Sequence, residues 1–298
     1  MKKLMFLAAA AALLTACAGS AGFGAAGPPT TGAAGSGIAP DPVRPHAKSV
    51  VVLIMENRDY DRVIGNRDAP YIDNVLVPQS ALMTNSHAIG HPSQPNYLAL
   101  FSGSTQGIIN DSCPHNFSGE NLGNELLTAG ISFAGYTETM PSDGFTGCLA
   151  HLYARKHNPW VDFTNVPSSA NLVYDGFPAS PPTVMFLVPN LCHDMHNCTT
   201  REGDHWLRNH LSPILQYNAA NDGLLVITWD EAAPDVDGSD RIPTLLIGPM
   251  IRPGEYTQYV SHYNVLRTIE EIFEVPCVAN ACGARPLARM WRNDSPII

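Results

Sequence analysis

Oxygen-bearing side chains stand directly after two short apolar runs of this sequence, residues 50–55 and 224–229. They are Glu56 and Asn57 after the first run, and Asp230 and Glu231 after the second. A short apolar run that ends in polar residues is typical of a buried strand in a parallel sheet, and ligands of such sheets gather where the strands end. We therefore expect these side chains to converge as oxygen ligands of a divalent cation. Mg²⁺, Mn²⁺, Ca²⁺ and Zn²⁺ all remain candidates.

A serine that can act as a nucleophile lies between these two pairs. Ser93 lies just before a predicted helix, Pro95–Ser102, whose first turn carries a proline. The free N–H groups of a first turn and the helix dipole stabilise an anion, so a phosphate or sulfate ester is the expected ligand. A cation bound to the hydroxyl would make Ser93 a better nucleophile at neutral pH. The alternative interpretations are that Ser93 is only a helix cap and that the acids are ordinary loop carboxylates.

The elements that must position these residues alternate along the sequence. Strands are predicted at Val50–Met55, Ser132–Thr137, Thr183–Val188, Leu224–Trp229 and Ile242–Ile247. Helices are predicted at Pro95–Ser102, Leu122–Ala129, Asp204–Tyr217 and Tyr263–Phe273. Such alternation predicts an α/β fold with a mainly parallel central sheet and helices on both faces. Asp204 is expected to be either the cap of its helix or a site residue.

The N-terminal residues predict export and a membrane anchor. A basic start followed by an apolar stretch too short to span a membrane indicates a signal peptide over residues 1–16. The order Leu-Thr-Ala-Cys that ends at Cys17 resembles a bacterial lipobox, so we expect a lipidated outer-membrane lipoprotein at the periplasmic face or cell surface. Residues 17–45 are mostly small or proline and predict a flexible tether, which leaves residues 46–298 as a single domain.

Charge and cysteine content narrow the partners and the compartment. The formal net charge of −10 argues against nucleic acid, which needs a basic patch on the protein. Apart from Cys17, the remaining cysteines are even in number, which favours disulfides in an oxidising compartment. Their spacing suggests Cys192 with Cys198 and Cys277 with Cys282, which leaves Cys113 with Cys148. The alternative at one pair is a zinc site built from Cys192, His193, His196 and Cys198.

Several motifs occur in an order that is similar to a known family. Residues 56–61 read Glu-Asn-Arg-Asp-Tyr-Asp, and further motifs lie at residues 91–97, 156–159, 189–196, 203–204, 230–231, 243–249 and 262–273. Together they resemble the phosphoesterase family that holds acid phosphatases and non-specific phospholipases C, and most of all its compact secreted acid phosphatases. That family looks like a branch of the alkaline phosphatase superfamily. The resemblance therefore implies an alkaline phosphatase-like fold and a hydrolase of phosphoric esters.

The resemblance also implies roles for single residues. Related nucleotide pyrophosphatases carry their nucleophile two positions before a proline, and the same offset from Pro95 implies Ser93 as the catalytic residue. The implied metal ligands are Glu56, Asn57, Ser93, Asp230 and Glu231. Phosphate and the leaving group need cationic or hydrogen-bonding partners, and those implied are His91, Asn110, Lys156, His157, Asp194 and His196. The histidines among them are alternatively structural, and His91 is alternatively a turn residue.

One position departs from the family pattern. Many relatives place a histidine shortly after the acidic pair, where this sequence has Arg241. A guanidinium can bind phosphate, but it cannot ligate a metal or shuttle a proton. One metal ion is therefore expected, and a second ion near Asp194 and His196 is left open. His262, at the start of the last predicted helix, is expected to be structural.

The predicted function is a secreted, metal-dependent phosphomonoesterase of the acid phosphatase type. Ser93 is expected to attack phosphorus in line, and water then hydrolyses the phosphoserine. The substrate is a phosphate ester, either a small molecule or a lipid head group. The alternatives are a phospholipase C-type phosphodiesterase, a phosphoinositide phosphatase, and a lipid-anchored binding protein that has kept the fold without catalysis.

Overall fold

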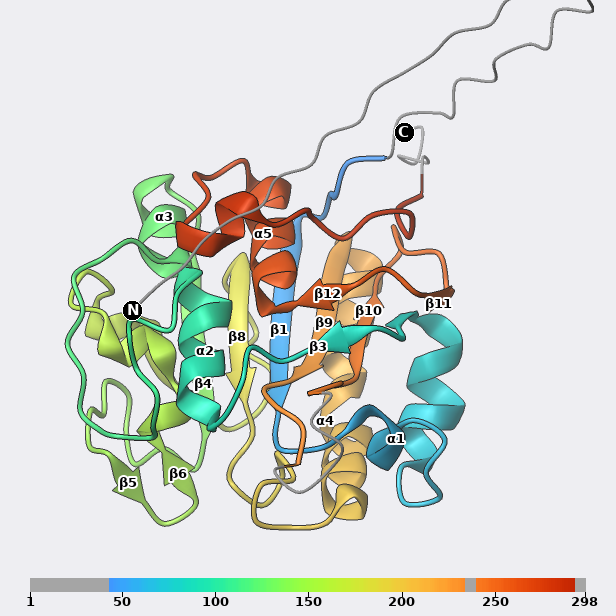
Figure 1. The fold of residues 1–298 in the computed structure, drawn as a ribbon, viewed down its shortest axis with the longest axis horizontal. Helices are drawn as coiled ribbons and strands as arrows, with labels where there is room; N and C mark the ends of the chain where they lie inside the picture. The colour runs from blue at the N-terminus through green and yellow to red at the C-terminus, as the bar shows by residue number, and fades with distance from the viewer. Residues whose placement is uncertain (1–42, 234–239, 293–298) are drawn as a thin grey trace, which may run out of the picture. The chain divides into compact units, whose positions relative to one another are not determined.

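A central, mostly parallel sheet organises the protein (Figure 1). The computed structural model describes residues 43–233 and 240–292, so the predicted signal peptide, Cys17 and most of the predicted tether lie outside the described residues. In sheet order the strands are β11 (Gly254–Tyr256), β2 (Ala81–Met83), β10 (Thr244–Ile247), β9 (Gly223–Trp229), β1 (Ser49–Met55), β8 (Val184–Val188), β4 (Phe133–Glu138) and β7 (Asn171–Tyr174). Only β10 runs antiparallel to its neighbours in this sheet, which confirms the predicted α/β class.

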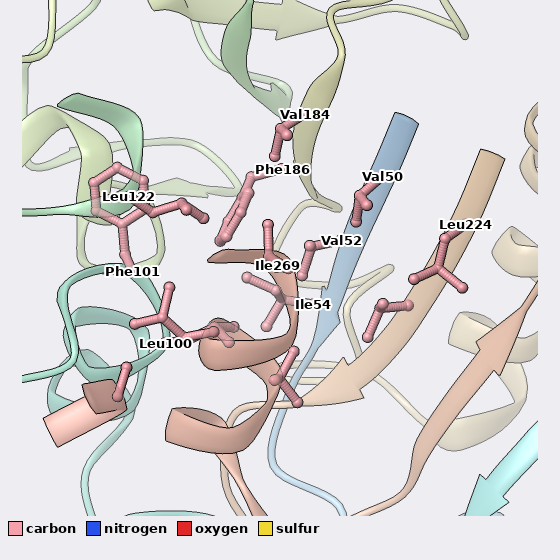
Figure 2. Close-up of a cluster of buried hydrophobic side chains, with 14 of the residues drawn as sticks. Val50, Val52, Ile54, Leu100, Phe101, Leu122, Val184, Phe186, Leu224 and Ile269 are labelled. Atoms are coloured by element: carbon pink, nitrogen blue, oxygen red, sulfur yellow. The ribbon is translucent and has the colours of Figure 1, made fainter. Parts of the chain in front are cut away.

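Helices cover both faces of the sheet. They are α1 (Tyr60–Val63), α2 (Ser93–Ser102), α3 (Leu122–Thr128), α4 (Thr200–Ala220) and α5 (His262–Phe273). Successive residues of β1 point to opposite faces, so Val52 packs with α2, α3 and α5 whereas Leu53 packs with α1 and α4. Figure 2 shows the first of these two clusters, where Phe101, Leu122 and Ile269 surround β1 and β8.

Shorter elements complete the chain. Two small ribbons join β3 (Ser86–His87) with β12 (Val260–Ser261), and β5 (Leu149–Ala150) with β6 (Tyr153–Ala154). Short helical turns lie at Ile72–Leu76, Val77–Gln79, Arg155–His157, Pro159–Asp162, Ser168–Ala170 and Ala279–Gly283. Within the described residues, no helix has both the length and the apolar character needed to cross a membrane.

The predicted elements all form, with changes at their ends. The last predicted strand begins at Thr244 instead of Ile242, because Pro243 has no N–H to donate to a neighbouring strand. The expectation that Asp204 caps its helix was wrong. Helix α4 begins at Thr200, and the Thr199 side chain accepts a hydrogen bond from the Glu202 N–H. Asp204 lies inside α4, where its carboxylate accepts hydrogen bonds from the Tyr71 and Ile72 N–H groups at 3.1 and 2.8 Å.

The predicted disulfides are confirmed. The bridges are Cys113–Cys148, Cys192–Cys198 and Cys277–Cys282. Because the sulfurs of Cys192 and Cys198 are bonded to each other, neither is a free thiolate, and the alternative zinc site was wrong. Disulfides persist in oxidising compartments, so the three bridges indicate an exported protein.

Candidate active site

The two pairs of oxygen-bearing residues meet because β1 and β9 run in parallel and in register. Met55 lies opposite Trp229, so Glu56 and Asp230 leave the sheet side by side. The Asp230 N–H donates to the Met55 carbonyl oxygen at 2.9 Å. The Asn57 N–H donates to Asp230 Oδ1 at 3.1 Å, from a left-handed backbone conformation that asparagine tolerates. The structure therefore brings together the four residues that follow the two strands.

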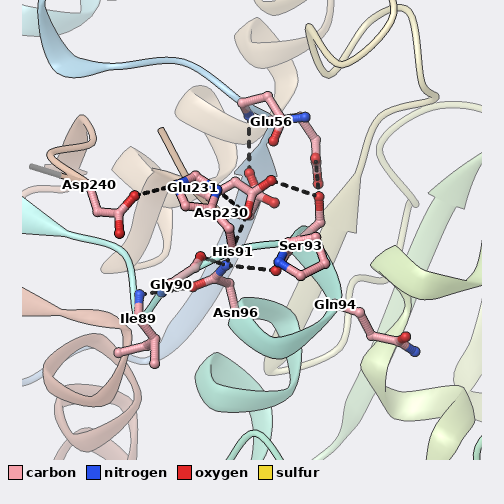
Figure 3. A network of polar contacts seen from close by, with 12 residues as sticks. Glu56, Ile89, Gly90, His91, Ser93, Gln94, Asn96, Asp230, Glu231 and Asp240 are labelled. Atoms are coloured by element: carbon pink, nitrogen blue, oxygen red, sulfur yellow. Dashed lines mark hydrogen bonds and ion pairs between the residues drawn. The ribbon is translucent and has the colours of Figure 1, made fainter. Parts of the chain in front are cut away.

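Ser93 is the first residue of α2 and points into this carboxylate cluster (Figure 3). Its Oγ lies 3.2 Å from Glu56 Oε2 and 3.4 Å from Glu231 Oε1, and it can donate its single proton to one of them at a time. The Asn96 side chain, one turn further along α2, donates to Glu231 Oε2 at 3.4 Å. Asn96 Oδ1 accepts the Ile89 N–H at 2.8 Å, so Asn96 also holds the segment that enters the helix. Sequence reasoning assigned no role to Asn96.

Burial makes the carboxylates of this cluster unstable as anions. Burial, followed by the charge of Asp230, raises the pKa of Glu56 well above 4.5. The same two causes raise the pKa of Glu231 to about 9, and burial raises the pKa of Asp230 to about 6. Like charges in a low-dielectric site repel each other, and a bound cation relieves that repulsion while protons are released. The electrostatics therefore suit a cation.

Several buried oxygen atoms of the cluster have no hydrogen-bond partner among the described residues. They are Asn57 Oδ1, Asp230 Oδ2 and Asp194 Oδ2. Buried polar atoms in folded proteins are nearly always paired, so three unpaired acceptors in one site indicate an electropositive ligand. Carboxylate and amide oxygens are the atoms that hard divalent cations bind. The residues present thus fit a metal ion.

A histidine lies beside Glu56 Oε1, the carboxylate oxygen that does not contact Ser93. His157 is buried and stacks on Tyr97 with ring centroids 4.9 Å apart. Its Nε2 lies 3.2 Å from Glu56 Oε1, and its Nδ1 lies 3.6 Å from Asp194 Oδ2. Tyr97 also donates a hydrogen bond to Glu56 Oε1. Burial and the Lys156 charge lower the pKa of His157 well below 6.5, so its imidazole is neutral.

A group of possible metal ligands extends the site on this side. Glu56, His157 and His196 each offer one ligand atom, and the three atoms lie within 4.8 Å of one another. Asp194 Oδ1 accepts the His196 N–H at 2.7 Å and so positions the second histidine. The sequence left a second ion open near Asp194 and His196, and of these two His196 belongs to this group.

Lys156 adds a positive charge beside the cluster. Its Nζ donates to Asp111 Oδ2 at 2.8 Å and lies 3.4 Å from His196 Nε2. Burial alone would lower the pKa of Lys156, but the hydrogen bond to Asp111 and the charge of Glu56 outweigh it and raise the pKa. The lysine is therefore a permanent cation at the edge of the site.

Asp111 contacts the site, whereas the sequence predicted this role for its neighbour Asn110. Asp111 Oδ1 accepts the Gln94 N–H at 3.0 Å, next to Ser93. Asn110 is exposed, and its Oδ1 accepts the Ser112 N–H at 3.1 Å in a turn. Among the described residues the Asn110 side chain forms no hydrogen bond with Ser93 or Lys156. The only sequence signal for Asp111 is its position one residue after the nominated asparagine.

His91 and His262 contact acidic residues of the site, whereas Arg241 contacts a backbone carbonyl before β3. His91 Nδ1 lies 3.0 Å from Glu231 Oε2, and His91 Nε2 lies 2.5 Å from Asp240 Oδ1, so this histidine bridges two acids. His262 Nε2 donates to the Asp230 carbonyl oxygen at 2.6 Å, and burial lowers its pKa to about 4. Arg241 donates to the Thr84 carbonyl oxygen at 2.8 Å.

Arg241 also stacks on an aromatic ring. Its guanidinium carbon lies 3.9 Å from the centroid of the Tyr60 ring, at the base of α1. Its Nη1 lies 3.6 Å from Asp61 Oδ1. The residue that departs from the family pattern therefore braces α1 against the segment before β3.

Comparison with solved structures defines the class. The fold is similar to that of an alkaline phosphatase superfamily protein from Vibrio parahaemolyticus, with a TM-score of 0.57, 15% identity and coverage of 83% of this chain and 72% of that one. The periplasmic domain of EptC from Escherichia coli, solved with Zn, is similar at a TM-score of 0.51 and 11% identity over 78% of this chain and 84% of that one. The protein is thus an α/β protein with the alkaline phosphatase-like fold.

Sequence comparison defines the family. The model of the Phosphoesterase family matches residues 66–276, and the chain belongs to that family. It is 45% identical to a phosphatidylinositol-3-phosphatase of Mycobacterium tuberculosis over 81% of this chain and 82% of that protein. It is 31% identical to a probable acid phosphatase of Kluyveromyces lactis, over 84% of this chain but 64% of the yeast protein. The protein is a hydrolase that acts on phosphoric ester bonds.

Proposed function

We propose that the protein is a metal-dependent phosphomonoesterase whose nucleophile is Ser93. The observation that supports this most directly is the position of Ser93 Oγ, at the first residue of α2 and within 3.4 Å of both Glu56 and Glu231. A serine hydroxyl that faces buried carboxylates with unpaired oxygens nearby is suited to activation by a cation. The same position places the serine where a helix N-terminus favours a phosphoryl group.

The proposed metal ligands are Glu56, Asn57, Ser93, Asp230 and Glu231. A divalent cation held by them would supply Lewis-acid stabilisation of the serine oxygen and neutralise charge on the ester. Only one ion is required by this proposal. The group of Glu56, His157 and His196 is the candidate for a second ion, and its identity, like that of the first, is decided by metal analysis.

The residues of the chain would then perform two displacements. Ser93 Oγ gives its proton to a neighbouring carboxylate as it forms a bond to phosphorus, and the bond from phosphorus to the leaving oxygen breaks. The leaving oxygen takes a proton, and the cationic Lys156 stabilises the charge that develops nearby. Water then attacks phosphorus, the bond to Ser93 Oγ breaks, and the serine regains a proton. The products are an alcohol and inorganic phosphate.

The decisive experiment removes the nucleophile and keeps the other four proposed metal ligands. Ser93→Ala in the metal-loaded protein should reduce hydrolysis of a soluble aryl phosphate by at least about 10³-fold, because covalent catalysis is lost. Circular dichroism and metal analysis of the variant should match the wild type to within a factor of about two. Ser102→Ala, a serine of the same helix whose Oγ donates to the Leu98 carbonyl, is the control and should stay active. Substantial turnover by Ser93→Ala would show that the nucleophile is another residue.

A lipid phosphate is the second candidate substrate. The Mycobacterium tuberculosis relative is named for a phosphoinositide, and the side chains of Ile109 and Leu149 are 81% and 73% exposed. Ile109 lies in the loop after α2 and Leu149 begins β5, and the Cys113–Cys148 disulfide joins these two segments. The same segments lead to Asp111 and Lys156 beside the site. Exposed apolar side chains next to a phosphate site suit contact with a bilayer.

Vesicles distinguish the two substrates. The assay compares an aryl phosphate with phosphatidylcholine vesicles that contain phosphatidylinositol 3-phosphate. If lipid is the substrate, Ile109→Ser with Leu149→Ser should raise the KM for vesicles about fivefold or more and leave aryl phosphate turnover unchanged. Wild-type protein that hydrolyses the aryl phosphate but not the vesicles would contradict the lipid assignment alone. Release of a phosphorylated head group from phosphatidylcholine would instead indicate a phospholipase C.

The proposal includes export and anchoring through Cys17. Three disulfides support an oxidising compartment, and residues 1–16 supply the predicted signal peptide. Cys17→Ser should shift the protein from the membrane fraction to the soluble periplasmic fraction. Mass spectrometry of the mature N-terminus is the direct measurement. An unmodified Cys17 in membrane-derived protein would contradict the lipid anchor.

A further inference from the structure

The first turn of α2 has few donors for an anion. Pro92 is the cap of this ten-residue helix and Pro95 is its third residue, and neither has an N–H. The backbone donors available at the helix start are therefore those of Ser93 and Gln94. The Gln94 N–H, next to the proposed nucleophile, donates to Asp111 Oδ1 at 3.0 Å. A carboxylate of the chain itself thus occupies half of the anion site at this helix.

The other oxygen of the same carboxylate holds the nearby cation. Asp111 Oδ2 accepts from Lys156 Nζ at 2.8 Å. One backbone N–H at a helix start and one ammonium group are the two donors that a phosphoryl group attached to Ser93 needs. Asp111 therefore sits between them as a phosphate oxygen would. The single Gln94 N–H cannot serve two anions at once, so a substrate phosphate and Asp111 compete for this donor and for the charge of Lys156.

We propose that Asp111 is a displaceable internal anion that sets the affinity of the site for phosphate. The inference rests on the proposed function and specifies how the same site binds substrate and product. When phosphate enters, the Asp111 carboxylate leaves the Gln94 N–H and Lys156 and turns toward solvent. When phosphate leaves, the carboxylate returns. Asp111 thereby weakens the binding of inorganic phosphate, the product of the proposed reaction.

Exposure and anchoring make such an exchange physically reasonable. The Asp111 side chain is 32% exposed, so its carboxylate can be hydrated outside the site at small cost. The loop that carries it is held by other bonds, namely the Cys113–Cys148 disulfide and the Phe117 N–H, which donates to the Asp162 carbonyl oxygen at 2.7 Å. Displacement of the Asp111 side chain therefore leaves the loop attached at Cys113 and Phe117.

The test removes the charge of Asp111 and keeps its size. Asp111→Asn retains an oxygen that can accept the Gln94 N–H, but it no longer competes as an anion. We expect the dissociation constant of inorganic phosphate, measured by calorimetry on the metal-loaded full chain, to fall about tenfold. The inhibition constant of phosphate against aryl phosphate hydrolysis should fall by the same factor. A residue that only positions Lys156 predicts the opposite, namely weaker phosphate binding.

The control is a matched aspartate–lysine pair away from the site. Asp222 pairs with Lys48 at 2.8 Å before β9, whereas the site lies after the other end of that strand. Asp222→Asn should leave phosphate binding unchanged. Lys156→Gln should weaken phosphate binding more in the Asp111→Asn background than in the wild type. In the wild type the Asp111 carboxylate already pairs with Lys156 and competes with phosphate for it, whereas in Asp111→Asn this competing charge is absent. Asp111→Ser is the second neutral variant if Asp111→Asn proves unstable.

The outcomes separate this inference from the proposed function. Unchanged or weaker phosphate binding in both neutral Asp111 variants would overturn the internal anion, even if wild-type turnover is normal. Tighter phosphate binding without turnover in any metal would support the internal anion and overturn the proposed phosphomonoesterase.

Discussion

At the residue scale, the main feature is a set of buried acids whose charges the protein alone does not neutralise. Glu56 and Asp230 are 0% and 1% exposed, and Glu231 is 4% exposed. Tyr97 and Ser93 donate hydrogen bonds to this set, yet Asp230 Oδ2 and Asn57 Oδ1 have no partner within the described part of the chain. A buried polar group without a hydrogen-bond partner costs about 1–3 kcal/mol, and a charged group costs more. A bound cation accounts for that arrangement.

The first prediction follows from these charges. Asp230→Asn with Glu231→Gln keeps the volumes of both side chains but removes two negative charges. We expect the affinity for a divalent cation to fall by at least about 100-fold, because carboxylates bound directly to the ion carry most of the affinity for hard cations. Metal analysis after dialysis and titration calorimetry measure it.

The control for this prediction changes two surface acids in the same way. Asp222 and Glu274 pair with Lys48 and Arg44 at 2.8 and 3.9 Å on the surface. Asp222→Asn with Glu274→Gln should retain the metal. If the Asp230 and Glu231 variant kept its full metal content, the metal ligands would lie elsewhere in the protein.

At the element scale, α5 links the sheet to the C-terminal segment through a buried acid. The side chain of Glu270 is 0% exposed, and its Oε1 accepts the Val278 N–H at 2.9 Å. Burial raises the pKa of Glu270 to about 7. The acid is therefore protonated in the folded protein at pH values where it is ionised in the unfolded chain.

The second prediction concerns the pH dependence of stability. Between pH 4.5 and about 7 the folded Glu270 holds a proton that the unfolded chain has lost. The free energy of unfolding from this group should therefore fall as pH rises, by about 1.4 kcal/mol per pH unit in that window. Glu270→Gln is neutral at every pH and retains an acceptor for the Val278 N–H. Urea unfolding at several pH values should therefore show a weaker dependence of stability on pH in this variant than in the wild type. The same slope in Glu270→Gln and wild type would refute the assignment.

Glu271→Gln is the matched control for the helix. Glu271 is the next residue of α5, where its carboxylate pairs with Arg267 and with Arg44. This pair is near the surface, and exposed ion pairs contribute about 0–1 kcal/mol. We expect Glu271→Gln to leave the pH slope unchanged. If Glu270→Gln and Glu271→Gln weakened the pH dependence of stability equally, the effect would come from the total charge of α5 and not from Glu270.

At the scale of the whole molecule, disulfides hold the loops that complete the site. Cys113–Cys148 joins the loop of Asp111 to the segment before Lys156, across a sequence separation of 35 residues. Cys277–Cys282 closes a much shorter loop, with a separation of 5 residues, after α5. One bridge therefore braces the site and the other braces the C-terminal segment.

The third prediction compares these two bridges. In the chain-entropy model, Cys113→Ser with Cys148→Ser should lower the free energy of unfolding by about 4 kcal/mol, and Cys277→Ser with Cys282→Ser by about 2 kcal/mol. Only the first pair of changes should also raise the KM for an aryl phosphate, since only that bridge holds the segment that leads to Lys156, the cation proposed to bind phosphate. Urea unfolding and steady-state kinetics measure the two effects. Equal effects of both variants on KM would show that the long bridge does not order the site.

Much of the fold and part of the site follow from local sequence. The short apolar runs of β1 and β9 end in polar residues and favour buried strands, and the helices start at cap or proline signals. The strands β2, β7 and β11 are 3, 4 and 3 residues long and carry no such signal, so they were not predicted. Asp204 resembled a cap locally, but Thr199 caps α4.

The sequence by itself determined the fold class, the order of the main elements, the disulfide pairs and the residues that lead out of β1 and β9. These depend on hydrophobic period, turn chemistry and cysteine spacing, which are local properties of the chain. Only the tertiary structure decided that Asp111 meets Gln94 and Lys156, that Asn96 supports Glu231, and that Arg241 stacks on Tyr60. Those contacts join residues far apart in sequence or depend on side-chain direction, and their geometry exists only once the sheet and its loops have packed together.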